Sequence, residues 1–345
     1  TNVVLKREPV MNPIFSRTLK ALCSVMAAAL LSACGGASST VDPFVATRVI
    51  AFGDGFNYVD ASGAGLSTVR TGETDITIAG RIAARYGIVV KDVATGPALS
   101  ATGGFSYASD RAKVSHVVTQ IDTFLTQASG VVAKKDLIVI AVGNWEVKAA
   151  VASATPAADM DTATTNLVTA IQRLTAAGAE HVVVMPAINM ARTPWAATSP
   201  NSKSLADIQQ LSITTSPLPG LNSFNFLLLT KLNAAYRQDK KPVYLLDRSS
   251  DFNNFAGQFD TNGTTRIINV SGLALTADTG LYMPVCTTPT SMAGCLPADL
   301  STVSPLTATS YQSYVFADDI NLTPLANRYL ADRMLYTMQA FGWAP

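Results

Sequence analysis

The sequence predicts an α/β protein in which helices cover both faces of a parallel β-sheet. Five short stretches are apolar on both faces, as strands buried between two layers of helices are. Segments with helical spacing of apolar residues lie between them, and this alternation is typical of parallel strands. The 345 residues are 48% hydrophobic and 14% charged, which suffices for a large core.

The expected elements alternate along the chain. The strands cover residues 48–54, 87–93, 136–143, 181–187 and 242–247, and the second is the least apolar. The helices cover residues 74–87, 114–128, 160–178, 225–238 and 325–342. Residues 258–315 combine weak strand patterns with many loop residues, and we interpret them as an insertion near the site. Ligands in such sheets bind at the carboxyl ends of the strands.

The first 33 residues have the pattern of a leader. We interpret residues 1–10 as a mis-assigned gene start, because a signal-peptide pattern begins at Met11. Arg17 and Lys20 form its positive region, and a short apolar stretch and small residues follow. The apolar stretch is too short for a comfortable transmembrane span. The sequence therefore predicts an exported protein.

The segment from Leu31 to Cys34, "LSAC", resembles the lipobox of bacterial lipoproteins. The resemblance implies cleavage before Cys34, acylation of that cysteine and attachment to a membrane through the lipid. Residues 34–46 would then be the acylated cysteine and a flexible tether. Gly35 at the second position implies the outer membrane, on its periplasmic face or at the cell surface. The alternative is an ordinary secretory signal with an incidental cysteine.

The remaining cysteines and the charge exclude other classes of site. Cys286 and Cys295 lie in one loop-like segment of an exported chain, so we expect a local disulfide between them. Two cysteines without nearby histidines make a poor metal site, and we expect neither a metal nor a cofactor. The formal net charge is +1 without a basic run, which argues against nucleic acid as a partner.

Four short blocks occur in order along the chain. They read "FGDGFNYVD" from Phe52, "GGFSYASDRAKV" from Gly103, "IVIAVGNWEV" from Ile138 and "YVFADDINLTPLANRYLA" from Tyr314. In this order they resemble the GDSL family of the SGNH hydrolases, which are exported lipases and esterases. The resemblance implies a single domain over residues 47–345, folded as a three-layer α/β/α sandwich with a flavodoxin-like, five-stranded parallel sheet.

The resemblance also assigns the site residues. In this family a serine attacks the ester, a histidine takes its proton and an aspartate orients the histidine. Gly55 stands at the serine position and Asn321 at the histidine position. Asp318 keeps the acid, and Asn144 keeps the asparagine that stabilises the oxyanion. Glycine cannot attack a carbonyl and asparagine is not a base near neutral pH, so we expect no ester hydrolysis.

Other departures fall near the same positions. Asp110 and Arg111 replace the glycine pair of the second block, which puts a backbone donor in doubt. A strained position between strand and turn favours glycine, which would explain Gly55 once no serine is needed. Each of the two histidines, His116 and His181, is expected to have a structural or surface role.

The residues leave three functional hypotheses. The first is a non-catalytic protein that keeps a binding cleft for an acyl, acetylated-sugar or polymer ligand. Trp145 would then be either a stacking surface or a residue that fills the former site. The second is an active ester hydrolase with a displaced nucleophile, and the third is a structural or assembly component of the cell surface. The sequence predicts neither a protein partner nor an oligomeric state.

Overall fold

A computed structural model describes the chain over residues 44–60, 76–93, 99–198, 204–215, 223–236, 242–257, 267–270, 273–276 and 315–345. The predicted leader, the acylated Cys34 and the disulfide between Cys286 and Cys295 lie outside these ranges. Within them, no helix combines the length and the apolar character that crossing a membrane requires.

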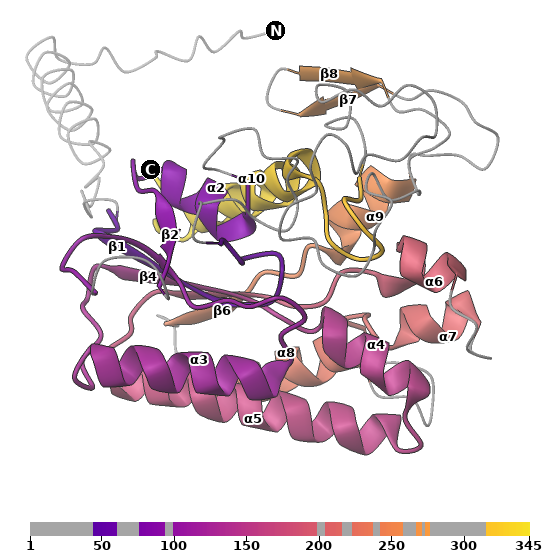
Figure 1. Cartoon of the computed structure of the whole chain (residues 1–345), viewed down its shortest axis with the longest axis horizontal. Helices are drawn as coiled ribbons and strands as arrows, with labels where there is room; N and C mark the ends of the chain where they lie inside the picture. Colours follow the sequence, from indigo (N-terminus) through magenta and orange to yellow (C-terminus); the bar gives the residue numbers. More distant parts are fainter. Residues whose placement is uncertain are drawn as a thin grey trace, which may run out of the picture. The chain divides into compact units, whose positions relative to one another are not determined.

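The central sheet has six strands, and all its neighbouring pairs are parallel (Figure 1). In space the order is β2-β3-β1-β4-β5-β6. The strands are β1 (Arg48–Gly53), β2 (Val90–Asp92), β3 (Gly103–Ser106), β4 (Asp136–Ala141), β5 (Val182–Met185) and β6 (Val243–Leu245). The predicted α/β class and its parallel sheet are confirmed.

The predicted strand count of five is wrong, because β3 was not expected. Without the edge strand β2, the order is β3-β1-β4-β5-β6, which is the expected flavodoxin-like order. β3 reads "GGFS", and glycine weakens a strand and gives it no apolar pattern. Gly104 has a packing role there, because a Cβ atom at this position would lie 2.7 Å from the carbonyl oxygen of Val89.

Helices cover both faces of the sheet, as predicted. Figure 1 shows α3, α5 and α8 on one face, and α2 and α10 on the other. The α-helices are α2 (Ile78–Ala84), α3 (Val114–Gln127), α4 (Asn144–Ala152), α5 (Pro156–Ala176), α6 (Pro194–Thr198), α7 (Leu205–Gln210), α8 (Phe224–Ala235), α9 (Ser249–Gly257) and α10 (Pro324–Ala340). The predicted insertion contains one antiparallel pair, β7 (Ile267–Val270) and β8 (Leu273–Thr276).

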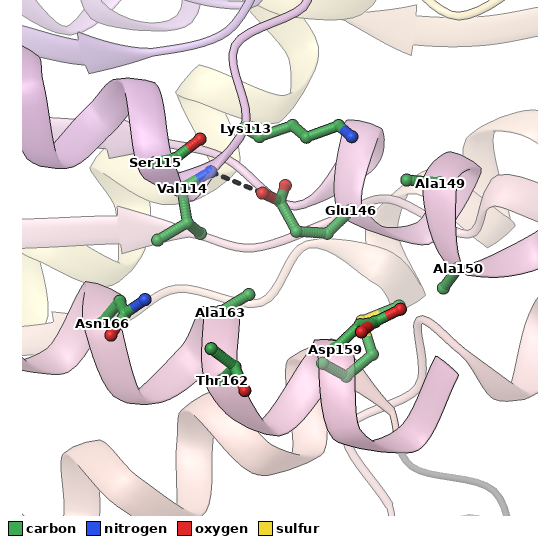
Figure 2. A pocket seen from close by; sticks show the side chains of 11 residues that line it. Lys113, Val114, Ser115, Glu146, Ala149, Ala150, Asp159, Thr162, Ala163 and Asn166 are labelled. Carbon is green, nitrogen blue, oxygen red and sulfur yellow. Dashed lines mark hydrogen bonds between the residues drawn. The ribbon is translucent and has the colours of Figure 1, made fainter. Parts of the chain in front are cut away.

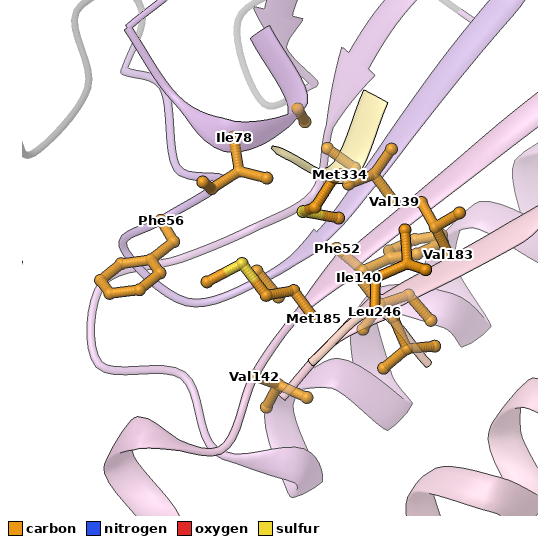
Figure 3. Packing of buried hydrophobic residues seen from close by; sticks show 14 of the residues in the cluster. Phe52, Phe56, Ile78, Val139, Ile140, Val142, Val183, Met185, Leu246 and Met334 are labelled. Atoms are coloured by element: carbon orange, nitrogen blue, oxygen red, sulfur yellow. The ribbon is translucent and has the colours of Figure 1, made fainter. Parts of the chain in front are cut away.

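The core lies between the sheet and these helices. All six residues of β1 and all six of β4 are buried. Figure 3 shows Phe52, Ile140 and Val183 from three neighbouring strands in one cluster with Met334 of α10. Because these strands are parallel and in register, their carboxyl ends lie along one edge of the sheet, and the loops that follow them meet there.

A buried ion pair joins the two central strands at their amino ends. The Nε atom of Arg48 donates to Oδ1 of Asp136 at 2.7 Å, and its Nη2 atom lies 2.5 Å from Oδ2. Asp136 is fully buried and also accepts the backbone N–H of Ala133 at 2.8 Å. The pair therefore holds the first residues of β1 and β4 side by side.

Candidate functional site

The turn after β1 places Gly55 at the carboxyl edge of the sheet. Oδ1 of Asp54 accepts the N–H of Phe56 at 3.1 Å, and the carbonyl of Asp54 accepts the N–H of Asn57 at 3.0 Å. The left-handed backbone falls on Gly53, whose φ is +126°, whereas Gly55 is not among the described glycines with positive φ. Backbone strain therefore explains the glycine at position 53 and does not explain Gly55.

Asn144 links this turn to the loop after β5. Its Nδ2 atom donates to Oδ2 of Asp54 at 3.2 Å, and its Oδ1 atom accepts the N–H of Ile188 at 3.1 Å. Asn144 begins α4 directly after Gly143, whose φ of +125° allows the chain to leave the sheet sharply. The asparagine expected at the oxyanion position is thus held from two sides, with one amide hydrogen left over.

Burial has a large effect on Asp54. The carboxyl is fully buried, and this burial raises its pKa to about 7, against the opposing hydrogen bonds from Phe56 and Asn144. The charges of Glu146 and Asp110 raise the pKa further. Near neutral pH the turn therefore carries a carboxyl poised between its two protonation states.

The second block is anchored by a residue that the sequence analysis did not single out. Gln120 of α3 accepts the N–H of Gly53 at 2.8 Å and donates to the carbonyl of Gly53 at 3.1 Å. Its amide also donates to the hydroxyl of Ser109 at 3.3 Å. Arg111 has a φ of +54°, a conformation that glycine would adopt more readily. Arg111 therefore has a left-handed backbone conformation at one position of the predicted glycine pair.

In the fourth block Asn321 donates a side-chain hydrogen bond to Asp318. Its Nδ2 atom donates to Oδ2 of Asp318 at 2.8 Å. Oδ1 of Asp318 accepts the N–H groups of Ile320 at 2.7 Å and Asn321 at 2.5 Å. Burial raises the pKa of Asp318 to about 6. Oδ1 of Asn321 is buried and has no hydrogen-bond partner in the described part of the chain.

The third and fourth blocks are tied together by Lys148 of α4. Its Nζ atom lies 3.0 Å from Oδ2 of Asp319, next to Asp318 in the chain. The same ammonium lies 4.7 Å from the ring centre of Trp145 and 5.5 Å from that of Trp195. The guanidinium of Arg111 also lies over the Trp145 ring, at 5.6 Å. Trp145 is thus engaged by two cations of its own chain, which favours a filling role over a stacking surface for a ligand.

Comparison with protein families shows to which family the chain belongs. The sequence profile of the family described as GDSL-like lipase/acylhydrolase matches residues 49–334, which is most of the chain. The chain belongs to this family. The match spans all four blocks from Phe52 to the first part of α10.

Solved structures of GDSL-type proteins resemble the chain at low identity. A member of the lipolytic G-D-S-L family from Veillonella parvula is 11% identical, with a TM-score of 0.41, and the match covers 85% of this chain and 98% of that one. A protein described as a possible lipase from Chitinophaga pinensis is 9% identical, with a TM-score of 0.41, covering 86% and 99%. No curated protein sequence matches.

The two histidines of the chain, His116 and His181, have contacts outside the four residues predicted for the site. His181 lies at the start of β5, at the amino edge of the sheet, where its ring stacks on Phe44 at 3.7 Å and meets Trp343 at 4.8 Å. Burial lowers its pKa. The Nδ1 atom of His116 accepts the N–H of Lys113 at 3.0 Å, at the start of α3. The expected structural roles of both residues agree with these contacts.

Proposed function

We propose that this GDSL-like protein is an exported, lipid-anchored member of the family that binds a ligand and does not hydrolyse esters. The proposal is supported by the residues at the two positions that the resemblance assigns to the nucleophile and the base. Gly55 has no side chain, and Asn321 donates to Asp318 where a histidine would act as a base. Loss of either group in such a triad removes nearly all of its catalysis.

Hydrogen-bonding groups that remain at the site support a binding role. Asn144 has an amide hydrogen beyond the one given to Asp54, and Oδ1 of Asn321 is a buried acceptor without a partner in the described ranges. An unpaired buried acceptor is costly, and a ligand with a hydroxyl or amide donor would remove this cost. Acyl chains, acetylated sugars and polymers that contain such groups are the ligands we propose.

Burial of the same residues favours a second candidate function, a structural or assembly component of the cell surface. Asn144 is 2% exposed, and Asp318 and Asn321 are each 3% exposed. A polar network closed in this way stabilises a domain without any ligand. A panel of acetylated sugars and acylated amines, followed by amide NMR shifts, distinguishes the two: shifts at Asn144 and Asn321 support binding, and their absence with every probe supports the structural role.

Ester hydrolysis tests the loss of catalysis directly. We expect no rate above buffer for purified protein with p-nitrophenyl acetate, since a nucleophile and a base are both missing. The Asn144→Ala variant serves as the control, because a contaminating esterase would give both proteins the same rate. A rate that falls in Asn144→Ala would contradict the proposal and favour an active hydrolase with a displaced nucleophile.

A double variant tests whether the scaffold of the site is intact. The φ of Gly55 permits a serine, and a histidine at position 321 can donate to Asp318 as Asn321 does. We therefore expect Gly55→Ser combined with Asn321→His to hydrolyse p-nitrophenyl acetate about 10²-fold or more above the rate in buffer, while the wild type and each single variant stay inactive. A folded but inactive double variant would show that the oxyanion donors around Arg111 have also been lost.

The lipid anchor rests on the sequence and has its own test. We expect membrane-extracted protein to begin at Cys34 with a mass increased by a diacylglyceryl group, and Cys34→Ala to be recovered in the soluble periplasmic fraction. Unmodified Cys34 in the wild-type protein would contradict this part of the proposal and leave the ordinary secretory signal.

A further inference from the structure

A separate pocket lies between the start of α3, the helix α4 and the first half of α5 (Figure 2). It encloses about 320 Å³, and none of Asn144, Asp318 and Asn321 lines it. Its wall contains buried apolar side chains, among them Val114 and Met160. Pockets that hold small molecules combine an apolar lining with a few polar groups, and this volume is at the small end of their range.

Among the polar residues that line this pocket, Glu146 is a buried carboxylate. Figure 2 shows its side chain extending from α4 into the ring of lining residues. Glu146 is only 8% exposed. Its Oε1 atom accepts the N–H of Val114 at 2.5 Å, whereas its Oε2 atom is buried and has no partner in the described part of the chain. A buried oxygen without a partner costs free energy, and a ligand that donates a hydrogen bond to it would remove this cost.

The charges around the pocket indicate the ligand. Its ionisable lining residues are Lys113, Glu146 and Asp159, which carry one positive and up to two negative charges. Lys113 and Asp159 are exposed at the rim, and Asp159 bonds to Thr155 of its own helix start at 3.3 Å. The unpaired oxygen of Glu146 therefore lacks a donor, and a cation is the donor that a desolvated carboxylate binds most strongly.

We propose that this pocket binds a small aliphatic ammonium ion whose N–H donates to Oε2 of Glu146 while its hydrocarbon part packs on Val114, Ala150 and Met160. Rotation about the last side-chain bond, which has a soft torsional profile, turns Oε2 toward the ligand and moves Oε1 relative to the N–H of Val114. The volume fits a chain of a few carbons and excludes a long acyl chain.

The protonation of Glu146 makes the binding depend on pH. Burial raises the pKa of Glu146 to about 7, against the N–H groups of Val114 and of Glu146 itself and the charge of Lys113, which lower it. Asp159 on α5 and Asp54 after β1 are the other acids facing this region, and the charge of Glu146 raises the pKa of Asp54. Because only ionised Glu146 attracts an ammonium ion, affinity should be about tenfold higher at pH 8 than at pH 6.

Calorimetric titration of the full chain with n-butylammonium at pH 8 tests the proposal. We expect saturable binding with a Kd on the order of 1 mM, and 1-butanol, the neutral analogue, to bind at least about tenfold more weakly. The Glu146→Gln variant keeps an oxygen for the N–H of Val114 and loses the charge, so it should bind at least about tenfold more weakly. Glu180→Gln is the matched control, because Glu180 pairs with Lys134 outside the pocket.

A second variant keeps the proposal testable if Glu146→Gln fails to fold. Ala149 of α4 lines the pocket, and Ala149→Leu fills part of its volume while Glu146 stays in place. Butylammonium binding should be lost in Ala149→Leu and unchanged in Glu180→Gln. Equal binding of butanol and butylammonium, unchanged binding in Ala149→Leu, or no saturation by about 50 mM would each overturn the proposal.

Discussion

The turn after β1 depends on a glycine at position 53, two residues before Gly55, the position predicted for the nucleophile. The φ of Gly53 is +126°, and a Cβ atom there would lie 1.8 Å from the carbonyl oxygen of Ala141. The next residue, Asp54, donates its N–H to that same carbonyl at 3.0 Å. The close approach of β1 and β4 therefore fixes the glycine, and the direction in which Gly55 leaves the sheet follows from it.

This contact predicts a large effect of a small substitution. Gly53→Ala should lower the free energy of unfolding by roughly 3 kcal/mol or more, because it adds both backbone strain and a clash with Ala141. The matched control is Gly130→Ala, since Gly130 also has a positive φ of +74° but no atom within 4 Å of its Cβ position. The control should cost about 1 kcal/mol in urea unfolding. Equal losses would show that the two strands can separate at the turn.

For single residues of the site, the sequence predicts some positions and misses others. The blocks predict Gly55, Asn144, Asp318 and Asn321 as site residues, and all four lie in loops or at a helix start. Gln120 was not found, because its partner Gly53 is 67 positions away and an isolated glutamine in a helix has no distinguishing pattern. Such contacts depend on tertiary structure, which local sequence patterns do not contain.

At the scale of elements, the predicted strands and long helices agree with the structure. Both kinds of element bury apolar residues at regular intervals, and this spacing is visible in the sequence. The expected helix at 114–128 matches α3, and the expected strand at 136–143 contains β4. The helix α4 was missed, since its sequence "NWEVKAAVA" has no strongly amphipathic face and it begins inside the third block. β3 was missed for the related reason that close packing at Gly104 replaces an apolar pattern.

The ion pair between β1 and β4 gives a prediction at this scale. Asp136→Ala leaves Arg48 buried without its partner, and we expect a loss of roughly 3–5 kcal/mol in the free energy of unfolding. Glu180→Ala breaks the exposed pair with Lys134, whose side chain is 84% exposed, and should change stability by less than about 0.5 kcal/mol. Urea unfolding of both variants measures the difference. Comparable effects would mean that Arg48 reaches water when its partner is removed.

At the scale of the whole molecule, three buried carboxyls titrate far above the usual range of acids. Burial raises the pKa values of Asp54, Glu146 and Asp318 to about 7, about 7 and about 6. The folded chain therefore holds protons that the unfolded chain has already released between pH 5 and pH 8. Over this window the raised pKa values make stability fall as pH rises, while the lowered pKa of His181 acts in the opposite direction near pH 6.

The contribution of one carboxyl can be isolated. Glu146→Gln removes a titrating group but keeps an acceptor for Val114, so its stability should fall less than that of the wild type between pH 5 and pH 8. The difference should be on the order of 2 kcal/mol. Urea midpoints at the two pH values measure it, with Glu180→Gln as the control at an exposed side chain. An unchanged pH slope in Glu146→Gln would show that Glu146 titrates as an ordinary acid.

The hydrogen bond from Asn321 to Asp318 bears on the evolutionary route to this site. A histidine and an asparagine can both donate to that carboxylate, so exchanging one for the other leaves the loop of the fourth block with its hydrogen bonds to Asp318. Folding therefore exerts little selection against the exchange, and a lineage can lose its base without first acquiring compensating mutations. We therefore expect Asn321→His to leave the stability of the folded chain nearly unchanged.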